Sequence, residues 1–386
     1  MGEKLKISNL QQKKIIDDIY CPIIHGGLKL RFSNGKLLGN HCCLHYGNQK
    51  EFDNNNIWED KELKLVRKNN LNGIWDPSCW ICKSNEISNI PSFRTGMIEK
   101  FGIKTNLTGP LRLDLTISDN CNLACRTCGP HLSTFWQKFL KDNNIPILSD
   151  ENIGINNASK IIKILDNLNL SNLKMVVYSG GETLLGNEYW EVTKYLVDSV
   201  PNANKNLTIV FQTNGTMPIK EKYFEIIEKC HLVKLNISID SIGDKFEYLR
   251  WPAKWDQLVN NIQNFKNFLP FNVMFSFVET ISIFNLFYRD EMTQWINKNF
   301  STNKFGDVVN QNSHLAGGIF SLKNLTYEYI DGLKNTQLTN LIPENFKESP
   351  EEIKSMIDTI NKFDKIRGED WTRTFPEVAE FYKRYL

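Results

Sequence analysis

Five short apolar segments recur after residue 110, and they restrict the fold of this 386-residue chain more than any other feature. They cover residues 111–117, 174–179, 207–213, 233–239 and 272–278, and a weaker sixth lies near residues 307–310. Amphipathic stretches separate them, and in one of these Ile161, Ile164, Leu165 and Leu168 share a helical face. Strands that alternate with helices predict an α/β fold with a parallel sheet and right-handed crossovers.

The predicted strands are apolar on one face and polar on the other. In the fourth strand the apolar residues alternate with Asn236, Ser238 and Asp240, and the first strand has the same pattern. Successive side chains of a strand point to opposite faces. A sheet with one polar face suits a barrel whose interior holds water or a ligand. Six such units predict a partial (β/α)6 TIM-like barrel over residues 106–312.

Three cysteines, Cys121, Cys125 and Cys128, follow the first predicted strand in one short loop. Thiolates at this spacing can hold three corners of a cubane iron–sulfur cluster and leave the fourth iron open to another ligand. An incomplete zinc site and a set of inert thiols are the alternatives.

Polar or flexible residues follow the next three strands too. They are Gly180, Gly181 and Glu182 after the second strand, Thr213 and Asn214 at the end of the third, and Asp240 and Ser241 at the end of the fourth. Reactive groups of such barrels gather at the carboxyl ends of the strands, so we expect these segments to meet the cysteine loop on one rim. Glycines let a backbone approach a ligand, and Glu182 can accept a charge-assisted hydrogen bond from an ammonium group. Thr213 and Asn214 are candidate cofactor contacts or simply a turn.

The Cys-x3-Cys-x2-Cys loop and the later segment YSGGET together resemble the radical S-adenosylmethionine (radical SAM) superfamily. The resemblance implies the partial barrel, a [4Fe-4S] cluster on Cys121, Cys125 and Cys128, and SAM chelating the free iron through its amino and carboxylate groups. It also implies one-electron cleavage of SAM into methionine and a 5′-deoxyadenosyl radical. Thr127 departs from the pattern, because many members carry an aromatic residue just before the third cysteine.

Further SAM contacts are expected on the later strands. The resemblance implies that Asn236 and Ser238 meet the ribose or carboxylate of SAM and that Val278 contacts its adenine. Arg250 can offer a fork of donors to the carboxylate. The alternatives are a polar pair inside the barrel for Asn236 and Ser238, a surface ion pair for Arg250 and a core position for Val278.

A second group of thiols lies in residues 1–105, at Cys21, at the adjacent Cys42 and Cys43, and at Cys79-x2-Cys82. Four such ligands suit either zinc or an iron–sulfur cluster. The surrounding sequence looks like the SPASM or twitch modules that accompany many radical SAM enzymes, although those normally follow the barrel. That resemblance implies one auxiliary [4Fe-4S] cluster on Cys21, Cys43, Cys79 and Cys82, with Cys42 as the alternative to Cys43.

Further predictions concern residues 1–105 and residues 313–386. Gly35 is expected to form a hairpin turn, while His41 and His45 either replace a thiolate or stay solvated. Residues 313–386 carry three helical patterns and predict a C-terminal helical extension. Its aromatic residues Trp371, Phe375, Phe381 and Tyr382 are expected in a core rather than at a substrate entrance.

Composition narrows the class of protein. The net charge of +2 and the interleaved charges offer no basis for binding nucleic acid or an anionic membrane. An apolar stretch long enough to cross a bilayer and a secretion signal are both absent from the sequence. Nine cysteines in metal-like spacings indicate reduced, metal-bound sulfur rather than disulfides. We therefore expect a cytoplasmic protein.

These features together predict a radical SAM enzyme that abstracts a hydrogen atom from an unreactive C–H bond. Its substrate is expected to be a peptide or protein side chain, or a small metabolite, and an oxidoreductase, isomerase or peptide-modifying activity fits. A flavodoxin- or ferredoxin-type protein would donate the electron. The alternative is a non-catalytic, cysteine-rich protein that binds zinc or an iron–sulfur cluster.

Overall fold

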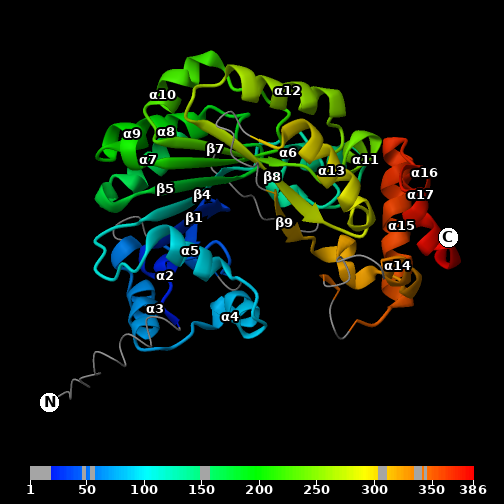
Figure 1. Cartoon of the computed structure of the whole chain (residues 1–386), viewed down its shortest axis with the longest axis horizontal. Coiled ribbons are helices and arrows are strands. Elements are labelled where there is room, and N and C mark those ends of the chain that lie inside the picture. The colour runs from blue at the N-terminus through cyan, green and yellow to red at the C-terminus, as the bar shows by residue number, and fades with distance from the viewer. Residues whose placement is uncertain are drawn as a thin grey trace.

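One nine-stranded sheet runs through the described part of this computed structural model, which covers residues 19–45, 49–52, 57–147, 157–302, 311–333, 341–342 and 346–386. The strand order is β3-β2-β1-β4-β5-β6-β7-β8-β9 (Figure 1). The strands are β1 (Gly27–Ser33), β2 (Lys36–Asn40), β3 (Lys50–Glu51), β4 (Arg112–Ser118), β5 (Met175–Gly180), β6 (Thr208–Thr213), β7 (Leu232–Ser238), β8 (Val273–Ile281) and β9 (Gln311–Leu315). Neighbours from β1 through β4 to β9 are parallel, while β2 and β3 are antiparallel.

The predicted mixed α/β fold with a mostly parallel sheet is confirmed. Strands β4 to β8 begin and end within a few residues of the five predicted segments. The predicted sixth strand at residues 307–310 lies outside the described residues, and β9 begins directly after it.

Helices cover the apolar face of this sheet. They include α7 (Ala158–Leu165), α8 (Glu188–Ser199), α9 (Ala203–Asn206), α10 (Phe224–Glu228), α12 (Trp255–Phe268) and α13 (Arg289–Phe300). Leu113, Leu115 and Ile117 of β4 are fully buried against this layer, in one core with Ile161 and Ile164 of α7. Each large aliphatic side chain buried this way contributes about 1.5–3 kcal/mol. The predicted helical face is therefore the face that packs on the sheet.

The other face of the sheet is polar and carries the N-terminal helices beside β1 and β4 (Figure 1). These are α2 (Pro22–Gly26), α3 (Lys61–Leu71), α4 (Trp80–Ile87) and α5 (Phe93–Phe101). Arg112 is buried there with Asp114, which accepts hydrogen bonds of 2.6 and 2.8 Å from its guanidinium. The polar side chains of the strands thus point into the inside of the curved sheet.

The hairpin between β1 and β2 forms as expected, with Gly35 in its two-residue turn. Asn34 and Gly35 both have positive φ, at 50° and 78°, as a tight hairpin turn requires. Because β1 also pairs in parallel with β4, the hairpin extends the main sheet. The division of the chain at residues 105 and 312 remains a prediction. Strand β1 precedes the first of these boundaries in sequence, yet it belongs to the same sheet as the strands that follow the boundary.

The C-terminal helices form a second apolar cluster at the other end of the molecule (Figure 1). They are α14 (Tyr327–Gly332), α15 (Pro350–Arg367), α16 (Trp371–Thr374) and α17 (Pro376–Phe381). Trp371, Phe375 and Tyr382 are at most 2% exposed in this cluster, and Phe381 packs at its edge. They occupy a core, as the sequence predicts.

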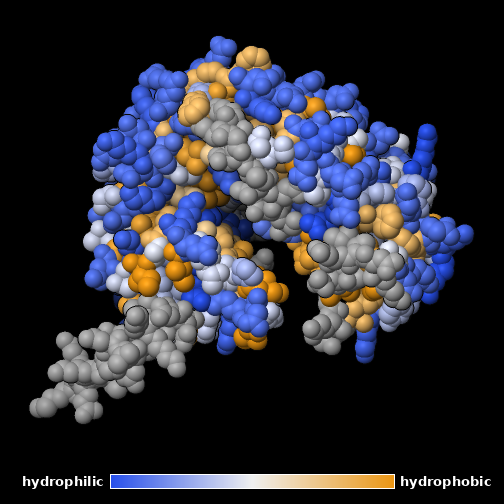
Figure 2. Space-filling view, in the orientation of Figure 1, coloured by the Kyte–Doolittle hydropathy of each residue, from blue (hydrophilic) through white to orange (hydrophobic). Residues whose placement is uncertain are grey.

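The surface is hollowed between the N-terminal helices and the C-terminal helices, below the sheet (Figure 2). Hydrophilic residues face this hollow near its centre, whereas apolar residues gather on the two units beside it. No helix in the described ranges is both long and apolar enough to cross a membrane.

Candidate metal and cofactor site

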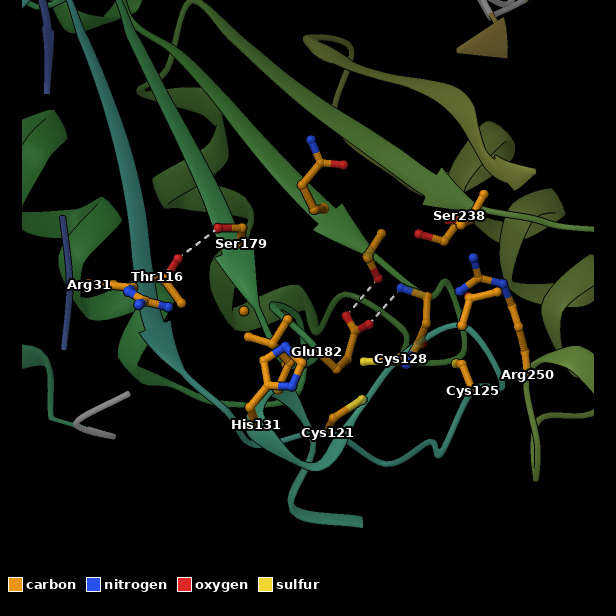
Figure 3. A pocket seen from close by; sticks show the side chains of 18 of the residues that line it. Arg31, Thr116, Cys121, Cys125, Cys128, His131, Ser179, Glu182, Ser238 and Arg250 are labelled. Carbon is orange, nitrogen blue, oxygen red and sulfur yellow. Dashed lines mark hydrogen bonds between the residues drawn. The ribbon is translucent and has the colours of Figure 1, made fainter. Parts of the chain in front are cut away.

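A pocket of about 460 Å³ lies where the cysteine loop meets the carboxyl ends of the strands (Figure 3). Cys121, Cys125 and Cys128 line it. Seven of the other expected site residues line it as well, namely Gly180, Gly181, Glu182, Thr213, Asn214, Ser238 and Arg250. The rim expected from the strand ends is therefore present as one continuous cavity.

Backbone hydrogen bonds from a distant loop hold the cysteine loop in shape. The Ala124 amide donates to the carbonyl oxygen of Trp251, and the Arg126 amide donates to that of Leu249, both at 2.7 Å. From α6 (Thr134–Asp142), the indole of Trp136 donates to the carbonyl oxygen of Cys125 at 2.9 Å. The loop is thus fixed from two sides before any ligand binds.

The side chains of Cys121 and Cys125 are half-buried and that of Cys128 is exposed toward the pocket. Burial raises the pKa of Cys121 to about 12, and it raises the pKa of Cys125 and Cys128 as well. The nearby Arg250 guanidinium acts in the opposite direction on Cys125 and Cys128. Thiolates at these positions need a neighbouring positive charge, and a bound metal supplies one.

The two glycines after β5 are required by the backbone of the cysteine loop. A Cβ atom on Gly181 would lie 2.3 Å from the carbonyl oxygen of Asn120, and one on Gly180 would lie 2.3 Å from that of Ser118. Gly180 also has φ of 125°, which disfavours other residues. The glycines therefore let β5 and the start of the cysteine loop touch, in addition to lining the pocket.

Glu182 is 1% exposed and joins the ends of β5 and β6. Its carboxylate accepts hydrogen bonds from the Thr213 hydroxyl at 2.6 Å, the Asn214 amide at 2.6 Å and the Leu184 amide at 2.9 Å. Burial raises the pKa of Glu182, and these three donors act against that rise. Among the described residues, Oε2 accepts a hydrogen bond from the Asn214 amide alone, which leaves a lone pair for a ligand in the pocket.

Arg250 lies inside the molecule, so the surface ion pair considered for it is excluded. It is 7% exposed and pairs with the buried Asp240 at 2.9 Å. Its Nε atom has no hydrogen-bond partner in the described part of the chain. Figure 3 shows the side chain beside Cys125. An anionic group next to the cysteine loop would find a fixed guanidinium here.

Two of the expected contacts do not reach the pocket. Asn236 accepts a hydrogen bond of 2.7 Å from the Ser276 hydroxyl of the neighbouring strand. Val278 is 8% exposed and belongs to the buried residues, while Thr280, two residues later, lines the pocket instead. Ser238 does line it, because it lies at the end of β7.

One possible group of metal ligands lies outside the cysteine loop. Among the described residues, His41, Asp76 and Cys79 form the only His, Cys, Asp or Glu triad whose ligand atoms all lie within 4.8 Å of one another. The three sulfurs of the cysteine loop therefore do not all lie within that distance of one another.

Residues 115–282 match the family model described as the radical SAM superfamily. This segment, somewhat less than half of the chain, is similar to that superfamily. It begins within β4, ends just after β8, and contains the cysteine loop, Glu182 and Arg250. Strand β1, which supplies Lys29 and Arg31 to the pocket lining, lies outside this segment.

Relatives of the radical SAM segment cover only part of the chain. A GTP 3′,8-cyclase of Clostridium acetobutylicum is 26% identical over 188 residues, which are 48% of this chain and 50% of that protein. The chain thus spans about half the length of this curated relative.

Two solved structures also resemble the chain. Native anSMEcpe with bound AdoMet is 16% identical, with a TM-score of 0.39 over 67% of this chain and 62% of that one. SuiB of Streptococcus suis bound to S-adenosylmethionine is 14% identical, with a TM-score of 0.36 over 80% and 58%. TM-scores this low support no conclusion about fold or ligands.

A second, smaller pocket gathers the N-terminal thiols away from the radical SAM segment. Cys21, Cys42, Cys79 and Cys82 line it. Burial raises the pKa of Cys21 to about 11 and that of Cys79 to about 12. The expected group of four thiols is therefore assembled, but with Cys42 in place of Cys43.

The preference for Cys43 over Cys42 is not supported by this geometry. Cys43 does not line this pocket; its sulfur is 3.8 Å from a guanidinium nitrogen of Arg112, and its thiol also contacts the thiol of Cys42. His41 is 2% exposed rather than solvated, and its Nε2 has no hydrogen-bond partner among the described residues. Burial lowers the pKa of His41 to about 4.

The strands themselves supply pocket residues that the sequence did not identify. They are Lys29 and Arg31 of β1, Thr116 of β4, Ser179 of β5, Gln212 of β6 and Thr280 of β8. The polar alternation of the later strands could have indicated Thr116, Ser179 and Gln212. No local pattern indicates that β1 joins the same sheet.

Proposed function

We propose that this protein is a radical SAM enzyme that reductively cleaves SAM and uses the 5′-deoxyadenosyl radical to abstract a hydrogen atom from its substrate. The observation that carries this proposal is the pocket at the carboxyl edge of the sheet. Within the segment that matches the radical SAM family model, three thiols there share one cavity with Glu182 and Arg250.

Each of these residues has a definite role in the proposal. Cys121, Cys125 and Cys128 hold a [4Fe-4S] cluster. That cluster, when bound, supplies one iron without a protein ligand for SAM and the single electron that cleaves it. In the proposal, the Arg250 guanidinium holds the carboxylate of SAM, and Oε2 of Glu182 accepts a hydrogen bond from its ammonium group.

The finer parts of the fold belong to the same proposal. Strands β4 to β9 would be the partial (β/α)6 barrel, and residues 313–386 would be a helical extension. Residues 1–105 would be a twitch- or SPASM-like module with an auxiliary [4Fe-4S] cluster on Cys21, Cys42, Cys79 and Cys82, a set supported by the pocket that they line. A peptide, protein side chain or small metabolite would be the substrate, and a cytoplasmic flavodoxin or ferredoxin the electron donor.

The proposal is tested by anaerobic purification, metal analysis and a SAM cleavage assay. We expect about eight iron and eight sulfide per chain, the content of two cubanes, and release of 5′-deoxyadenosine when dithionite and SAM are added. Colourless protein that contains zinc would instead support the non-catalytic alternative. Iron-containing protein that releases no 5′-deoxyadenosine would leave an iron–sulfur protein without SAM chemistry.

Single variants assign the two thiol groups. Cys125→Ala should abolish release of 5′-deoxyadenosine and retain about four iron per chain, the content of one cubane. Cys230→Ala is the matched control, because Cys230 is 2% exposed and lines neither thiol pocket. Loss of iron from the control variant, or full activity of Cys125→Ala, would contradict the assignment.

A further inference from the structure

An imidazole, a carboxylate and a thiol meet between the β1–β2 hairpin and α4. They belong to His41, Asp76 and Cys79, whose ligand atoms all lie within 4.8 Å of one another. We call these three residues the His41 triad. His41 directly follows β2, Cys79 ends the short 3-10 turn η2 (Pro77–Cys79) before α4, and Asp76 is the N-cap of that turn. The triad therefore joins the end of the hairpin to the start of a helix.

The backbone fixes both halves of the His41 triad. Side chains three positions apart lie on the same side of a 3-10 turn, which brings Asp76 and Cys79 together. The Cys79 amide donates to the carbonyl oxygen of Asp76 at 2.9 Å, and the Ser78 amide donates to Oδ1 of Asp76 at 2.9 Å. On the other half, a Cβ atom on Gly27 would lie 2.4 Å from the carbonyl oxygen of His41. That glycine therefore lets the histidine backbone pack directly against β1.

Polar atoms at the His41 triad are left without hydrogen bonds. His41 is 2% exposed, and its Nε2 has no partner in the described part of the chain. His45 packs edge-on against this ring, with the ring centroids 5.5 Å apart, and its Nδ1 is also buried without a described partner. Both hydrogen bonds from Ser78 go to Oδ1 of Asp76, so Oδ2 accepts none from the described residues. Buried polar atoms are normally paired, and a bound cation would satisfy these.

The donor set of the triad suits a single transition-metal ion. Imidazole nitrogen, carboxylate oxygen and thiolate sulfur are the ligands that zinc takes in proteins, at about 2.0–2.3 Å. Three ligand atoms as close together as these can surround one such ion. Calcium and magnesium prefer oxygen ligands, so the imidazole and the thiol disfavour them. Three protein ligands leave the fourth tetrahedral position to water.

The four thiols of the neighbouring pocket are less well placed for a single ion. They are the thiols of Cys21, Cys42, Cys79 and Cys82. No three of them lie within 4.8 Å of one another, because the His41 triad is the only such group among the described residues. A single zinc ion in this part of the molecule is therefore expected on the triad.

We propose that the His41 triad binds one divalent transition-metal ion of the zinc class. The site itself is independent of the proposed function, but one consequence rests on that function. Cys79 is also a proposed ligand of the auxiliary cluster, and its single sulfur serves one of the two centres at a time. Zinc at the triad and the auxiliary cluster therefore exclude each other in the same chain.

Cobalt titration of the reduced, iron-free, full-length chain tests the site. Co²⁺ substitutes for zinc, and its absorption reports tetrahedral geometry and a bond to thiolate. We expect saturable binding with a cobalt–thiolate band, reversed by an equimolar amount of zinc. Cobalt held by the cysteine loop contributes equally to the wild type and to the variants described next, so differences among them measure the triad.

Variants locate the ion. His41→Gln and Asp76→Asn should each weaken cobalt binding by more than about tenfold, the smallest loss typical even of residues that only support a metal ligand. Cys42→Ser is the matched control, because it removes a thiol of the neighbouring pocket and no member of the triad. Asp60→Asn alters another helix-capping carboxylate, that of α3, and should also bind like wild type. Circular dichroism verifies that each variant is folded.

Three results would overturn the metal site. They are no saturable cobalt binding by the wild type, equal binding by the wild type, His41→Gln and Asp76→Asn, or a loss in Cys42→Ser as large as that in His41→Gln. The last result would place the ion on the four thiols instead.

The competition for Cys79 has its own measurement. Zinc added during cluster reconstitution should lower the iron content of the wild type from about eight to about four per chain, and should leave His41→Gln at about eight. Unchanged iron in the wild type would refute the exclusion. Release of 5′-deoxyadenosine by wild type reconstituted without zinc judges the proposed function separately. An active enzyme without the cobalt site would refute only the triad, and an inactive protein with it only the SAM chemistry.

Discussion

Adjacent residues in the N-terminal thiol group lie in different environments. Cys42 lines the pocket with Cys21, Cys79 and Cys82, while Cys43 faces Arg112. The turn after β2 has no regular period, so the sequence could identify the pair but not the member that faces inward. For the thiols at fixed spacing, Cys79 and Cys82, the prediction and the geometry agree.

Replacing one of these neighbours at a time tests the arrangement. Cys42→Ser should lose about half of the bound iron, the content of one cubane, and keep SAM cleavage measurable with dithionite. Cys43→Ser is the matched control and should keep all of the iron. Iron and sulfide analysis of both proteins measures the difference, and the reverse pattern would restore Cys43 as the ligand.

A buried histidine makes stability depend on pH. His25 is 3% exposed, its Nε2 lies 3.1 Å from Oδ1 of Asn70, and burial lowers its pKa to about 4. The unfolded chain binds the proton at about pH 6.5. The contribution of neutral His25 is therefore complete above that pH and is lost as the pH falls towards 4.

The expected size of this effect can be measured by urea unfolding. Between pH 7 and pH 5 the wild type should lose on the order of 1–2 kcal/mol more stability than His25→Gln, which cannot be protonated. The comparison cancels other groups that titrate in both proteins. Equal losses in the two proteins would show that His25 does not control this pH range.

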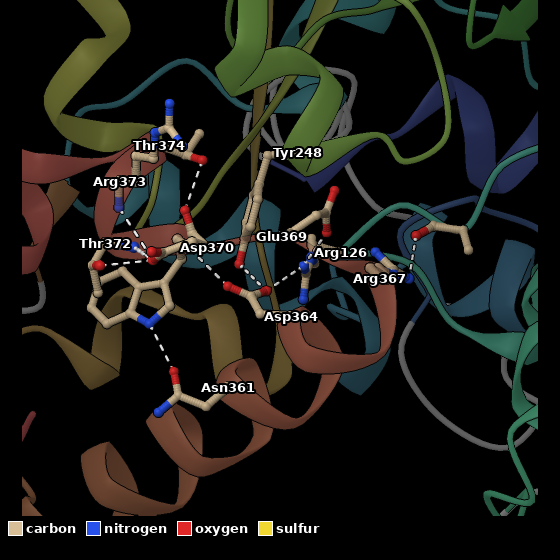
Figure 4. Close-up of polar contacts among 12 residues, drawn as sticks. Arg126, Tyr248, Asn361, Asp364, Arg367, Glu369, Asp370, Thr372, Arg373 and Thr374 are labelled. Atoms are coloured by element: carbon tan, nitrogen blue, oxygen red, sulfur yellow. Dashed lines mark hydrogen bonds and ion pairs between the residues drawn. The ribbon is translucent and has the colours of Figure 1, made fainter.

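At the scale of elements, helix α15 and the residues after it hold the cysteine loop in place (Figure 4). Arg126, between two of the loop cysteines, is 3% exposed and forms ion pairs with Asp364 and Glu369. The Tyr248 hydroxyl donates to Asp364 at 2.9 Å. Arg367 donates to the carbonyl oxygen of Ala124 at 3.0 Å. The C-terminal helices are thus tied directly to the proposed cluster loop.

Removing the charge of Arg126 should damage both stability and iron binding. Arg126→Met leaves Asp364 and Glu369 without their buried partner, and such losses cost about 3–5 kcal/mol. Denaturant unfolding and iron analysis measure the two effects. Lys138→Met removes an exposed ion pair of α6 and, as the control, should cost at most about 1 kcal/mol. An iron-replete, stable Arg126→Met protein would exclude this role.

Local patterns predicted those elements whose signals are local. The helix of α15 was indicated by Pro350 at its start and by Gly368 after its end, where φ is 68°. The contact of Arg126 with Asp364 and Glu369 joins residues more than 230 positions apart. Nothing in the composition of either segment encodes such a pairing, so it could not be predicted.

At the scale of the whole molecule, strands with a local sequence pattern could be predicted, whereas a pairing between strands distant in sequence could not. Strands β4 to β8 were predicted because their apolar and polar residues alternate. The parallel pairing of β1 with β4 could not be predicted in the same way. Two strands and the helices α3, α4 and α5 lie between them in sequence, so no single crossover helix joins them. The N-terminal cysteines suggested a separate unit, whereas the hairpin beside them extends the main sheet.

Deletion of residues 1–105 tests how independent the remainder is. The shortened chain would expose the edge of β4 and the buried Arg112–Asp114 pair. An unpaired strand edge promotes association with other chains. We therefore expect an aggregated product in size-exclusion chromatography at a concentration where the full chain is monodisperse. A soluble, cooperatively unfolding fragment would instead establish residues 106–386 as an independent folding unit.

The hairpin of β1 and β2 has a practical consequence for anyone who recombines such proteins. A cut between the N-terminal module and the barrel, placed where the sequence suggests a boundary, removes Lys29 and Arg31 from the pocket wall along with the module. A chimera that keeps the whole pocket wall must therefore inherit Gly27–Ser33 and Lys36–Asn40 together with the barrel. Exchange of the module alone would replace one strand of that wall with a strand of the donor.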